Sequence, residues 1–367
     1  MMTRKKILFI VEAMGGGVFT YIVDLANELV NTYDMYIAHA VRKQTPENYK
    51  NYFDKRIHLI KVQNFKREIS PARDVKAFFE IKRIAKEVRP DIIHFHSSKA
   101  GALGRAAFNG YKIPLFYTPH GYSFLMKNSS PIKRKIYYTI EKICGKKKCT
   151  IISCSKGEHR ESVKLSKRAV YVNNGINIDE LQSFIDGAGI IQPHSFTVFT
   201  LGRICYQKNP TMFNQVALAI PDVQFLWIGD GELRSELTAP NIKITGWTER
   251  KTALKYSLAC DAFMLTSLWE GLPISLLEAM YMRKPCVVSN VIGNKDVIHN
   301  GVNGNVCDEV DDYVAAIRTI QNTKFSHVTD NAYTDILQYY NTRVMAQNYN
   351  EIYKNSLTEK EKVVCSH

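Results

Sequence analysis

Short apolar runs alternate along this chain with longer stretches in which hydrophobic positions recur every three to four residues. The short runs predict buried strands, and the longer stretches predict amphipathic helices. Strands are expected at residues 6–11, 35–40, 57–62, 91–95, 114–118, 150–153 and 170–172, and then at 196–201, 223–228, 242–245, 261–265, 286–289 and 305–307. Helices are expected at residues 18–31, 73–88, 99–109, 131–147 and 156–167, and then at 210–220, 231–238, 249–258, 274–282 and 309–322. Such alternation is typical of parallel sheets with crossover helices, so the pattern predicts an α/β protein.

The length of 367 residues exceeds what one core usually holds and suits two domains of roughly 150–200 residues each. Residues 184–193, with two glycines and a proline, are the expected linker. The sequence therefore predicts an N-terminal domain at 1–185 and a C-terminal domain at 194–340. No apolar stretch reaches the roughly 18–20 residues of a membrane-spanning helix, and Glu12 ends the apolar run near the N-terminus. The eight cysteines include no C-x-x-C pair, which favours free thiols in a cytosolic protein.

The segment with the most candidate binding residues is 265–280, which reads L-T-S-L-W-E-G-L-P-I-S-L-L-E-A-M. Pro273 suits the first position of a helix, where its missing N–H costs nothing. The N–H groups of Ile274, Ser275 and Leu276 are then unpaired and form an anion site. Glu270 is expected in the loop at this site, and Glu278 about one turn into the helix, within reach of a hydroxyl. Phosphate on a helix end with carboxylates on nearby hydroxyls describes a nucleotide-sugar pocket; the alternative is one loop glutamate and one ordinary helical glutamate.

Four further segments stand at predicted strand ends. They are K-I-L-F-I-V-E-A-M-G-G-G at 6–17, Y-T-P-H-G-Y at 117–122, T-L-G-R-I-C-Y-Q-K-N at 200–209 and F-L-W-I-G-D-G-E-L at 225–233. With residues 265–280 they make five matches in order, and this set resembles the retaining glycosyltransferases of family 4. The resemblance implies the GT-B fold: two doubly wound, Rossmann-like domains that face each other across a cleft. It also implies that a C-terminal helix, at about residues 341–357, returns to the first domain.

The resemblance assigns roles to individual residues. Arg203 and Lys208 would hold the donor diphosphate, for which these cations are suited. Glu270 would bind donor-sugar hydroxyls, Glu278 the ribose, and His120 a hydroxyl beside the sugar. The remaining donor-binding positions are Gly16, Gly17, Gly202, Gly271, Ile274, Ser275 and Leu276. The glycine loop is neither a Walker loop nor a G-x-G-x-x-G fingerprint, so ATP and NAD are not expected.

No D-x-D sequence occurs in the chain. In the resembling fold Arg, Lys and a helix end neutralise the diphosphate, so neither a metal nor another cofactor is expected to be required. Retention is expected to follow from front-face attack, in which the acceptor hydroxyl approaches from the side that the diphosphate leaves. The sequence by itself leaves a double displacement open.

Two further groups of polar residues follow the strand predicted at 91–95. His94 and His96 share one face of that strand, and either a metal pair or strand-end packing explains them. Lys99 and Arg105 follow in S-S-K-A-G-A-L-G-R and are expected to meet acceptor phosphates. Trp247, in T-G-W-T-E, fits either a residue beside the nucleotide base or a core tryptophan.

Charge is distributed unevenly. Residues 1–186 hold 33 Lys and Arg against 17 Asp and Glu, whereas residues 187–367 hold 16 against 18. Residues 127–168 hold 13 basic and 3 acidic residues, with isoleucines at helical spacing between the basic clusters. A basic amphipathic helix at 131–148 can lie on an anionic membrane. The alternative is a solvated basic face whose apolar stripe lies in the core. No nucleic-acid recognition motif occurs, so nucleic acid is not an expected partner.

The sequence therefore predicts a cytoplasmic enzyme, peripheral on the inner face of the plasma membrane. It is expected to move a sugar from a nucleotide-sugar donor to a lipid-linked or polysaccharide acceptor, as in capsule or O-antigen assembly. One alternative is a nucleotide-sugar epimerase of the same fold. An alternative from another class is a basic module that binds nucleic acid or anionic surfaces, with salt-sensitive binding and no affinity for sugar nucleotides.

Overall fold

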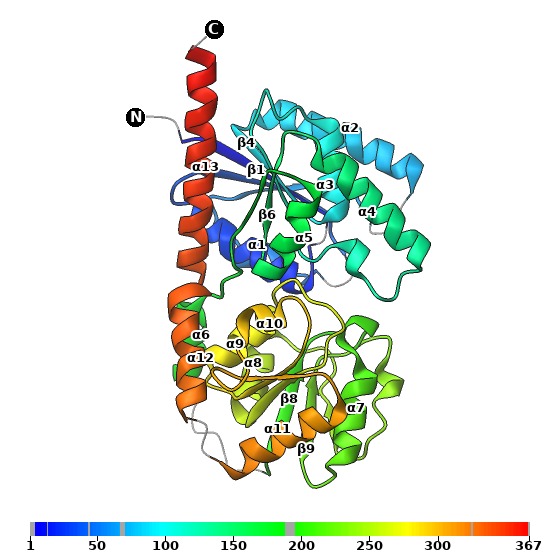
Figure 1. Cartoon of the computed structure of the whole chain (residues 1–367). Coiled ribbons are helices and arrows are strands. Elements are labelled where there is room, and N and C mark those ends of the chain that lie inside the picture. The colour runs from blue at the N-terminus through cyan, green and yellow to red at the C-terminus, as the bar shows by residue number, and fades with distance from the viewer. Residues whose placement is uncertain are drawn as a thin grey trace. The chain divides into compact units, whose positions relative to one another are not determined.

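The computed structural model describes residues 4–12, 14–42, 45–66, 70–187, 195–323 and 326–365. The chain forms two compact units (Figure 1). Unit 1 comprises Met1–Leu125, Ser129–Asn174 and Thr342–His367. Unit 2 comprises Met126–Asn128 and Gly175–Asn341. Each unit contains one parallel sheet.

Unit 1 is built on a seven-stranded parallel sheet in the order β3-β2-β1-β4-β5-β6-β7. The order reverses between β1 and β4, which is the switch point of a doubly wound sheet and the usual position of a ligand site. The strands are β1 (Lys6–Val11), β2 (Asp34–His39), β3 (His58–Lys61), β4 (Ile92–His96), β5 (Leu115–Thr118), β6 (Thr150–Ser153) and β7 (Ala169–Tyr171).

Helices cover both faces of this sheet (Figure 1). They are α1 (Gly16–Leu29), α2 (Pro71–Val88), α3 (Ser98–Ala107), α4 (Pro131–Gly145), α5 (Lys156–Leu165) and α13 (Thr342–Cys365), with 3₁₀ turns η1 (Tyr49–Tyr52) and η2 (Ser123–Leu125). Side chains of β1 alternate between two cores, as the period of a strand requires. Ile7, Phe9 and Val11 face α1 and α13, whereas Leu8 and Ile10 face the opposite core.

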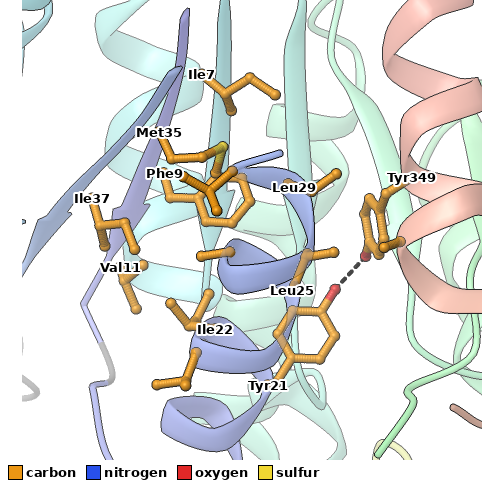
Figure 2. Close-up of a cluster of buried hydrophobic side chains, with 14 of the residues drawn as sticks. Ile7, Phe9, Val11, Tyr21, Ile22, Leu25, Leu29, Met35, Ile37 and Tyr349 are labelled. Atoms are coloured by element: carbon orange, nitrogen blue, oxygen red, sulfur yellow. Dashed lines mark hydrogen bonds between the residues drawn. The ribbon is translucent and has the colours of Figure 1, made fainter. Parts of the chain in front are cut away.

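The C-terminal helix α13 completes the core of unit 1. Met345, Ala346, Tyr349 and Tyr353 are buried with the residues of β1 and α1. Figure 2 shows Tyr349 reaching from α13 to Tyr21 of α1, whose hydroxyl donates a hydrogen bond to the Tyr349 hydroxyl at 2.5 Å. Residues more than 300 positions apart in sequence therefore share one core.

Unit 2 is built on a six-stranded parallel sheet in the order β10-β9-β8-β11-β12-β13. Its strands are β8 (Thr197–Leu201), β9 (Gln224–Ile228), β10 (Ile242–Ile244), β11 (Ala262–Leu265), β12 (Cys286–Ser289) and β13 (Asn305–Cys307). Its helices are α6 (Ile178–Asp186), α7 (Pro210–Ala219), α8 (Arg250–Ala259), α9 (Ile274–Tyr281), α10 (Asn294–Val297), α11 (Val310–Asn322) and α12 (Ser326–Tyr339), with 3₁₀ turns η3 (Tyr206–Lys208) and η4 (Arg234–Glu236).

The predicted α/β class with two doubly wound sheets is confirmed. Every predicted strand is present, with ends displaced by one residue at most. The helix predicted at 231–238 is wrong, because only the 3₁₀ turn η4 forms there. Helices α6, α10 and α12 were not predicted. Helix α6 begins after Asn177, whose side chain caps the Glu180 N–H at 3.0 Å, and runs into the predicted linker; residues 188–193 of that linker lie outside the described residues.

Candidate functional site

The predicted donor residues of unit 2 lie in loops that follow adjacent strands. Gly202 and Arg203 come directly after β8, and Glu270 lies in the loop between β11 and α9. Strands β8 and β11 are parallel neighbours, so their carboxyl ends meet at one edge of the sheet. The two loops are joined by hydrogen bonds, one of which runs from the Leu268 N–H to the Gln207 carbonyl oxygen at 2.8 Å.

Lys208 and Glu270 form an ion pair at this edge. The Lys208 Nζ lies 2.8 Å from Glu270 Oε1, and both side chains are largely shielded from solvent. Ser267 Oγ donates to the same carboxylate oxygen at 2.7 Å, and Gln207 Nε2 donates to the other oxygen at 3.3 Å. The structure therefore brings together the lysine and the glutamate that the sequence places 62 positions apart.

Two glycines allow the loops to approach each other. Gly202 has a φ of 150°, and a Cβ there would lie 3.3 Å from Lys208 Cε. Gly293, which was not predicted as a site residue, has a φ of 87°, and a Cβ there would lie 2.5 Å from the Gly271 carbonyl oxygen and 3.1 Å from Glu270 Cβ. A side chain at either position would displace a residue of the Lys208–Glu270 pair.

The start of α9 differs in detail from the prediction. Pro273 is the N-cap residue, so the first helical residue is Ile274. The Leu276 N–H donates to the Pro273 carbonyl oxygen at 3.2 Å, so the expectation that this N–H is unpaired is wrong. A tight first turn satisfies it, as helix termini often do. Ile274 and Ser275 occupy the positions whose N–H groups have no acceptor within the helix.

Arg203 and Glu278 have partners of their own. Arg203 Nη2 lies 3.8 Å from Glu232 Oε1 and is partly exposed. Glu278 is buried on α9, and its Oε1 lies 2.7 Å from Arg250 Nη1. Arg250 also lies 3.8 Å from Glu180 of α6. Sequence reasoning missed Arg250, because it stands at the start of α8 outside every motif and its partner is known only from the fold.

In unit 1 the His-Gly pair forms a turn directly after β5. His120 has a φ of 55° and Gly121 a φ of 90°, and a left-handed conformation is uncommon for histidine and typical of functional sites. The turn is held by the Gly121 N–H, which donates to Glu158 Oε1 at 2.7 Å. The edge of the Tyr21 ring packs on the His120 ring, with centroids 4.6 Å apart.

Three histidines, His94, His96 and His120, form what we call the histidine cluster. His94 Nδ1 lies 2.6 Å from the Tyr353 hydroxyl and its Nε2 lies 2.9 Å from Thr118 Oγ1. His96 Nδ1 lies 3.1 Å from His120 Nε2. Packing therefore explains His94, whose two nitrogens both bond to protein groups. Burial lowers the pKa of His120 to about 3, and burial with the neighbouring rings lowers the pKa values of His94 and His96 well below their ordinary range.

The glycine loop lies at the start of α1, beside the end of β1. Gly15 is the N-cap residue in an extended conformation, and Gly16 has a φ of 56° with no atom within 4 Å of an added Cβ. Nearby, Glu12 is buried and forms an ion pair with Arg42, and Ser97 Oγ donates to Glu12 Oε2 at 3.4 Å. Gly16 and Gly17 are exposed, and their role in binding stays a prediction.

The acceptor-binding role predicted for Arg105 is wrong. Its side chain is 0% exposed and lies in the core of unit 1, where Nη2 is 2.7 Å from Glu141 Oε2. Nε donates to the Gly101 carbonyl oxygen at 2.9 Å, and the guanidinium lies 4.1 Å from the centroid of the Tyr117 ring. Lys99 is tied down as well, with its Nζ 2.6 Å from Asp74 Oδ1. Both cations connect helices rather than extend toward a ligand.

Helix α4 presents its isoleucines to solvent, so the alternative of a stripe packed in the core is wrong. Ile132, Ile136 and Ile143 are 75%, 51% and 58% exposed, and Ile140 is exposed as well. Their spacing of four, four and three residues places them on one face. Glu141 and Gly145 are the only buried residues of this helix. We call the exposed face, with the flanking Lys133, Lys135 and Lys142, the isoleucine stripe.

The structure also bears on Trp247, on a possible metal site and on membrane-spanning helices. Trp247 is 65% exposed, so the core alternative for this residue is wrong. Within the described ranges, no group of three or more His, Cys, Asp or Glu side chains is placed to hold a metal ion. None of the helices in that same part of the chain has both the length and the apolarity needed to cross a membrane.

Comparison with known proteins identifies both units. Residues 15–180 match the sequence model of Glycosyltransferase Family 4, and residues 195–323 match that of Glycosyl transferases group 1. The chain is 29% identical over 310 residues to the UDP-Gal:alpha-D-GlcNAc-diphosphoundecaprenol alpha-1,3-galactosyltransferase of Escherichia coli, an alignment that covers 76% of this chain and 78% of that protein.

Solved structures share the fold. Sucrose-phosphate synthase from Thermosynechococcus elongatus matches with a TM-score of 0.81 at 17% identity, covering 97% of this chain and all of that one. Anabaena Alr3699/HepE in complex with UDP and glucose matches with a TM-score of 0.76 at 17% identity, covering 96% and 100%. These likenesses confirm the GT-B architecture predicted from the sequence.

Proposed function

The chain belongs to the family 4 glycosyltransferases, and we propose that it transfers a sugar from a UDP-sugar to a lipid-linked acceptor in the assembly of a bacterial surface polysaccharide, with retention of configuration. The observation that carries this proposal is the Lys208–Glu270 pair beside Gly202. The E. coli relative is named for transfer from UDP-Gal to a diphosphoundecaprenol-linked GlcNAc, which supports both the donor class and the acceptor class.

In this proposal the edge of unit 2 binds the donor. Lys208 and Arg203 contact the diphosphate and stabilise the charge that grows on it as the bond to the sugar breaks. The first turn of α9 contributes N–H groups to the same phosphates. Glu270, held by Ser267 and Gln207, accepts hydrogen bonds from sugar hydroxyls. Glu278 binds the ribose, beside Arg250.

Unit 1 contributes the remaining donor-binding positions, Gly16 and Gly17, and the histidine that contacts a hydroxyl beside the sugar. The open backbone at Gly16 and Gly17 and the side chain of His120 lie at the carboxyl ends of β1 and β5, around the switch point of the sheet. The acceptor hydroxyl attacks the sugar from the face that the diphosphate leaves, and a leaving phosphate oxygen takes its proton. The side chains that neutralise the phosphates are cationic, so we further propose that turnover requires no divalent metal. Turnover lost in EDTA and restored by Mn²⁺ would contradict that part of the proposal.

The decisive assay supplies UDP-galactose and a synthetic GlcNAc-diphospholipid to the purified full chain and measures the glycolipid product. Transfer with retained configuration, established by NMR of the new linkage, supports the proposal; an inverted linkage contradicts retention. Replacing Lys208 with Gln should abolish transfer, whereas Lys243→Gln, on the exposed side of β10, is the matched control. Conversion of the UDP-sugar without acceptor indicates the epimerase alternative. Salt-sensitive binding to nucleic acid, without affinity for any sugar nucleotide, indicates the binding-module alternative.

We also propose that the isoleucine stripe of α4 lies on the anionic surface of the cytoplasmic membrane, where a lipid-linked acceptor is anchored. An exposed apolar face between lysines matches the hydrocarbon boundary and the anionic headgroups of such a surface. Each basic residue near an anionic surface contributes about 1 kcal/mol. Four exposed isoleucines on one face have no other explanation within unit 1, because the core faces of its sheet are filled by other residues.

Vesicle binding tests this attachment. The wild type should bind vesicles rich in phosphatidylglycerol at low salt and should bind less as salt screens the charges. The double variant Ile136→Ser/Ile143→Ser should lose most of the binding, and Lys133→Gln/Lys135→Gln should lose the salt-sensitive part. Arg134 is left in place, because its Nε donates to the Phe124 carbonyl oxygen at 3.0 Å. Phe79→Ser, at an exposed apolar residue of α2, is the control. A wild type that ignores anionic vesicles would refute the attachment.

A further inference from the structure

A single hydrogen bond joins two ring nitrogens in the histidine cluster. His96 Nδ1 lies 3.1 Å from His120 Nε2. Burial keeps both rings neutral at neutral pH, and a neutral imidazole carries one N–H and one lone pair. The hydrogen bond therefore contains one proton. Whether that proton is bonded to His96 Nδ1 or to His120 Nε2 determines the tautomer of both histidines.

The surroundings of His96 show which of the two nitrogens carries the proton. The other nitrogen of His96, Nε2, is buried and has no hydrogen-bond partner among the described residues. The Phe9 ring packs against the His96 ring, with centroids 4.7 Å apart. A proton on Nε2 would leave a buried N–H without an acceptor, which is among the rarest unsatisfied groups in proteins. A proton on Nδ1 leaves only a lone pair unsatisfied, so His96 Nδ1–H donates to His120 Nε2.

We propose that His96 is a positioning residue that fixes His120 as the Nδ1–H tautomer, so that His120 offers a hydrogen-bond donor to a substrate oxygen. Because Nε2 of His120 is occupied as the acceptor, its proton resides on Nδ1. That nitrogen bonds to no described residue, and His120 is partly exposed. His120 then stabilises a hydroxyl or ring oxygen and does not remove a proton as a base. Only the identity of that oxygen as part of a sugar rests on the proposed function.

The orientation of the His120 ring is fixed from two further sides. The left-handed backbone at residue 120 and the Gly121 contact to Glu158 set its direction. The edge of Tyr21 covers the ring, and Tyr21 is itself held by Tyr349 of α13 at 2.5 Å. A ring flip would exchange Nδ1 with Cδ2 and Nε2 with Cε1, so it would break the bond to His96.

Nitrogen NMR of the full chain labelled with ¹⁵N-histidine tests the assignment directly. The His120 signals are identified by their loss in His120→Asn. In the wild type, the protonated nitrogen of His120 should be Nδ1, and its Nε2 should show the shift of an unprotonated, hydrogen-bonded nitrogen. An Nε2–H tautomer of His120 in the wild type would overturn the proposal without the use of any positioning variant.

Two substitutions separate positioning from structure. His96→Leu removes the N–H that donates to His120, so both tautomers of His120 should then be populated. The kcat/KM for the nucleotide-sugar should fall about tenfold, the effect of one lost hydrogen bond. His96→Asn places an amide N–H where Nδ1–H stood and should restore the tautomer and most of the lost rate. Circular dichroism shows that each variant folds. If His96→Leu changes neither tautomer nor rate, the proposal is wrong. If the wild type shows the Nδ1–H tautomer but transfers no sugar, the proposed function fails and the tautomer assignment stands.

Discussion

Replacing Arg105 with Met tests whether this arginine holds the fold or binds the acceptor. Arg105 and Glu141 are 0% and 5% exposed, with 2.7 Å between Nη2 and Oε2. Burial by itself would lower the pKa of Arg105, but the attraction of Glu141 raises it above its ordinary value, so the arginine stays charged. Removing one member of such a pair leaves the other charge buried, which costs about 3–5 kcal/mol. Folded domains have a total stability of about 5–15 kcal/mol, so the loss should be large.

The three tryptophans, Trp227, Trp247 and Trp269, all lie in unit 2, and this makes the assay selective. Tryptophan fluorescence in urea reports unit 2, whereas far-ultraviolet circular dichroism reports both units. Arg105→Met should move part of the circular dichroism transition to lower urea and leave the fluorescence transition in place. The double variant Arg105→Met/Glu141→Leu should recover most of the loss, because apolar side chains replace both charges.

The matched control is Arg83→Met, because Arg83 is exposed on α2 and its contact with Glu87 is 4.0 Å long. An exposed pair contributes about 0–1 kcal/mol, so this variant should unfold like the wild type. The reasoning fails if Arg105→Met leaves the circular dichroism transition unchanged and instead raises the KM for the acceptor. That result would restore the acceptor role that the sequence predicted for Arg105.

Three further predictions concern the donor site and the histidine cluster. Arg203→Ala should lower kcat at least about a hundredfold, as expected for a lost transition-state donor, while calorimetry shows unchanged binding of uridine; unchanged turnover would refute the role of Arg203. Glu278→Gln should mainly weaken nucleotide binding and Glu270→Gln should mainly lower kcat; identical kinetic profiles would show that one glutamate is misplaced. The histidine cluster should make unit 1 less stable below about pH 6.5, because the unfolded histidines bind protons that the folded ones, with lowered pKa values, do not. Between pH 7.5 and 5.5 each histidine should contribute about 1.4 kcal/mol in total, measured by urea unfolding across that range, and equal stability at its two ends would contradict the assignment.

The sequence predicted the elements well because the core pattern is local. The continuous apolar run of β1 is visible in six residues, and its neighbours need only their own apolar runs. The donor motifs could be placed for the same reason, since each stands at the end of a strand and parallel strands end at a common edge. Helix α10 has only four residues, too few for a periodic pattern. Helix α6 carries Ile178, Leu181 and Ile185 at helical spacing, but its end falls in the residues that the sequence assigned to the linker.

Long-range partners could not be predicted from local pattern. Arg105 stands in the helix predicted at 99–109, and only the packing of α3 against α4 shows that Glu141 neutralises it. The isoleucine spacing of α4 defines an apolar face, but the periodicity is the same whether that face meets a core or solvent. His94 depends on Tyr353, which lies 259 positions away on α13.

Under the proposed function, the Lys208–Glu270 pair predicts that the site binds the complete donor and not its separate parts. A donor that places its diphosphate on Lys208 and a sugar hydroxyl on Glu270 replaces one ion pair with two new contacts. Glu270 keeps its position during that exchange, because Ser267 and Gln207 hold the carboxylate independently of Lys208. Lys208 is a flexible stem with a single charged end, and turning it toward the phosphate breaks only the 2.8 Å contact. A bare nucleoside offers neither a phosphate nor a sugar hydroxyl at these positions, so it leaves the pair intact. The proposed function therefore predicts selectivity for the complete nucleotide-sugar, from a fixed carboxylate and a mobile cation.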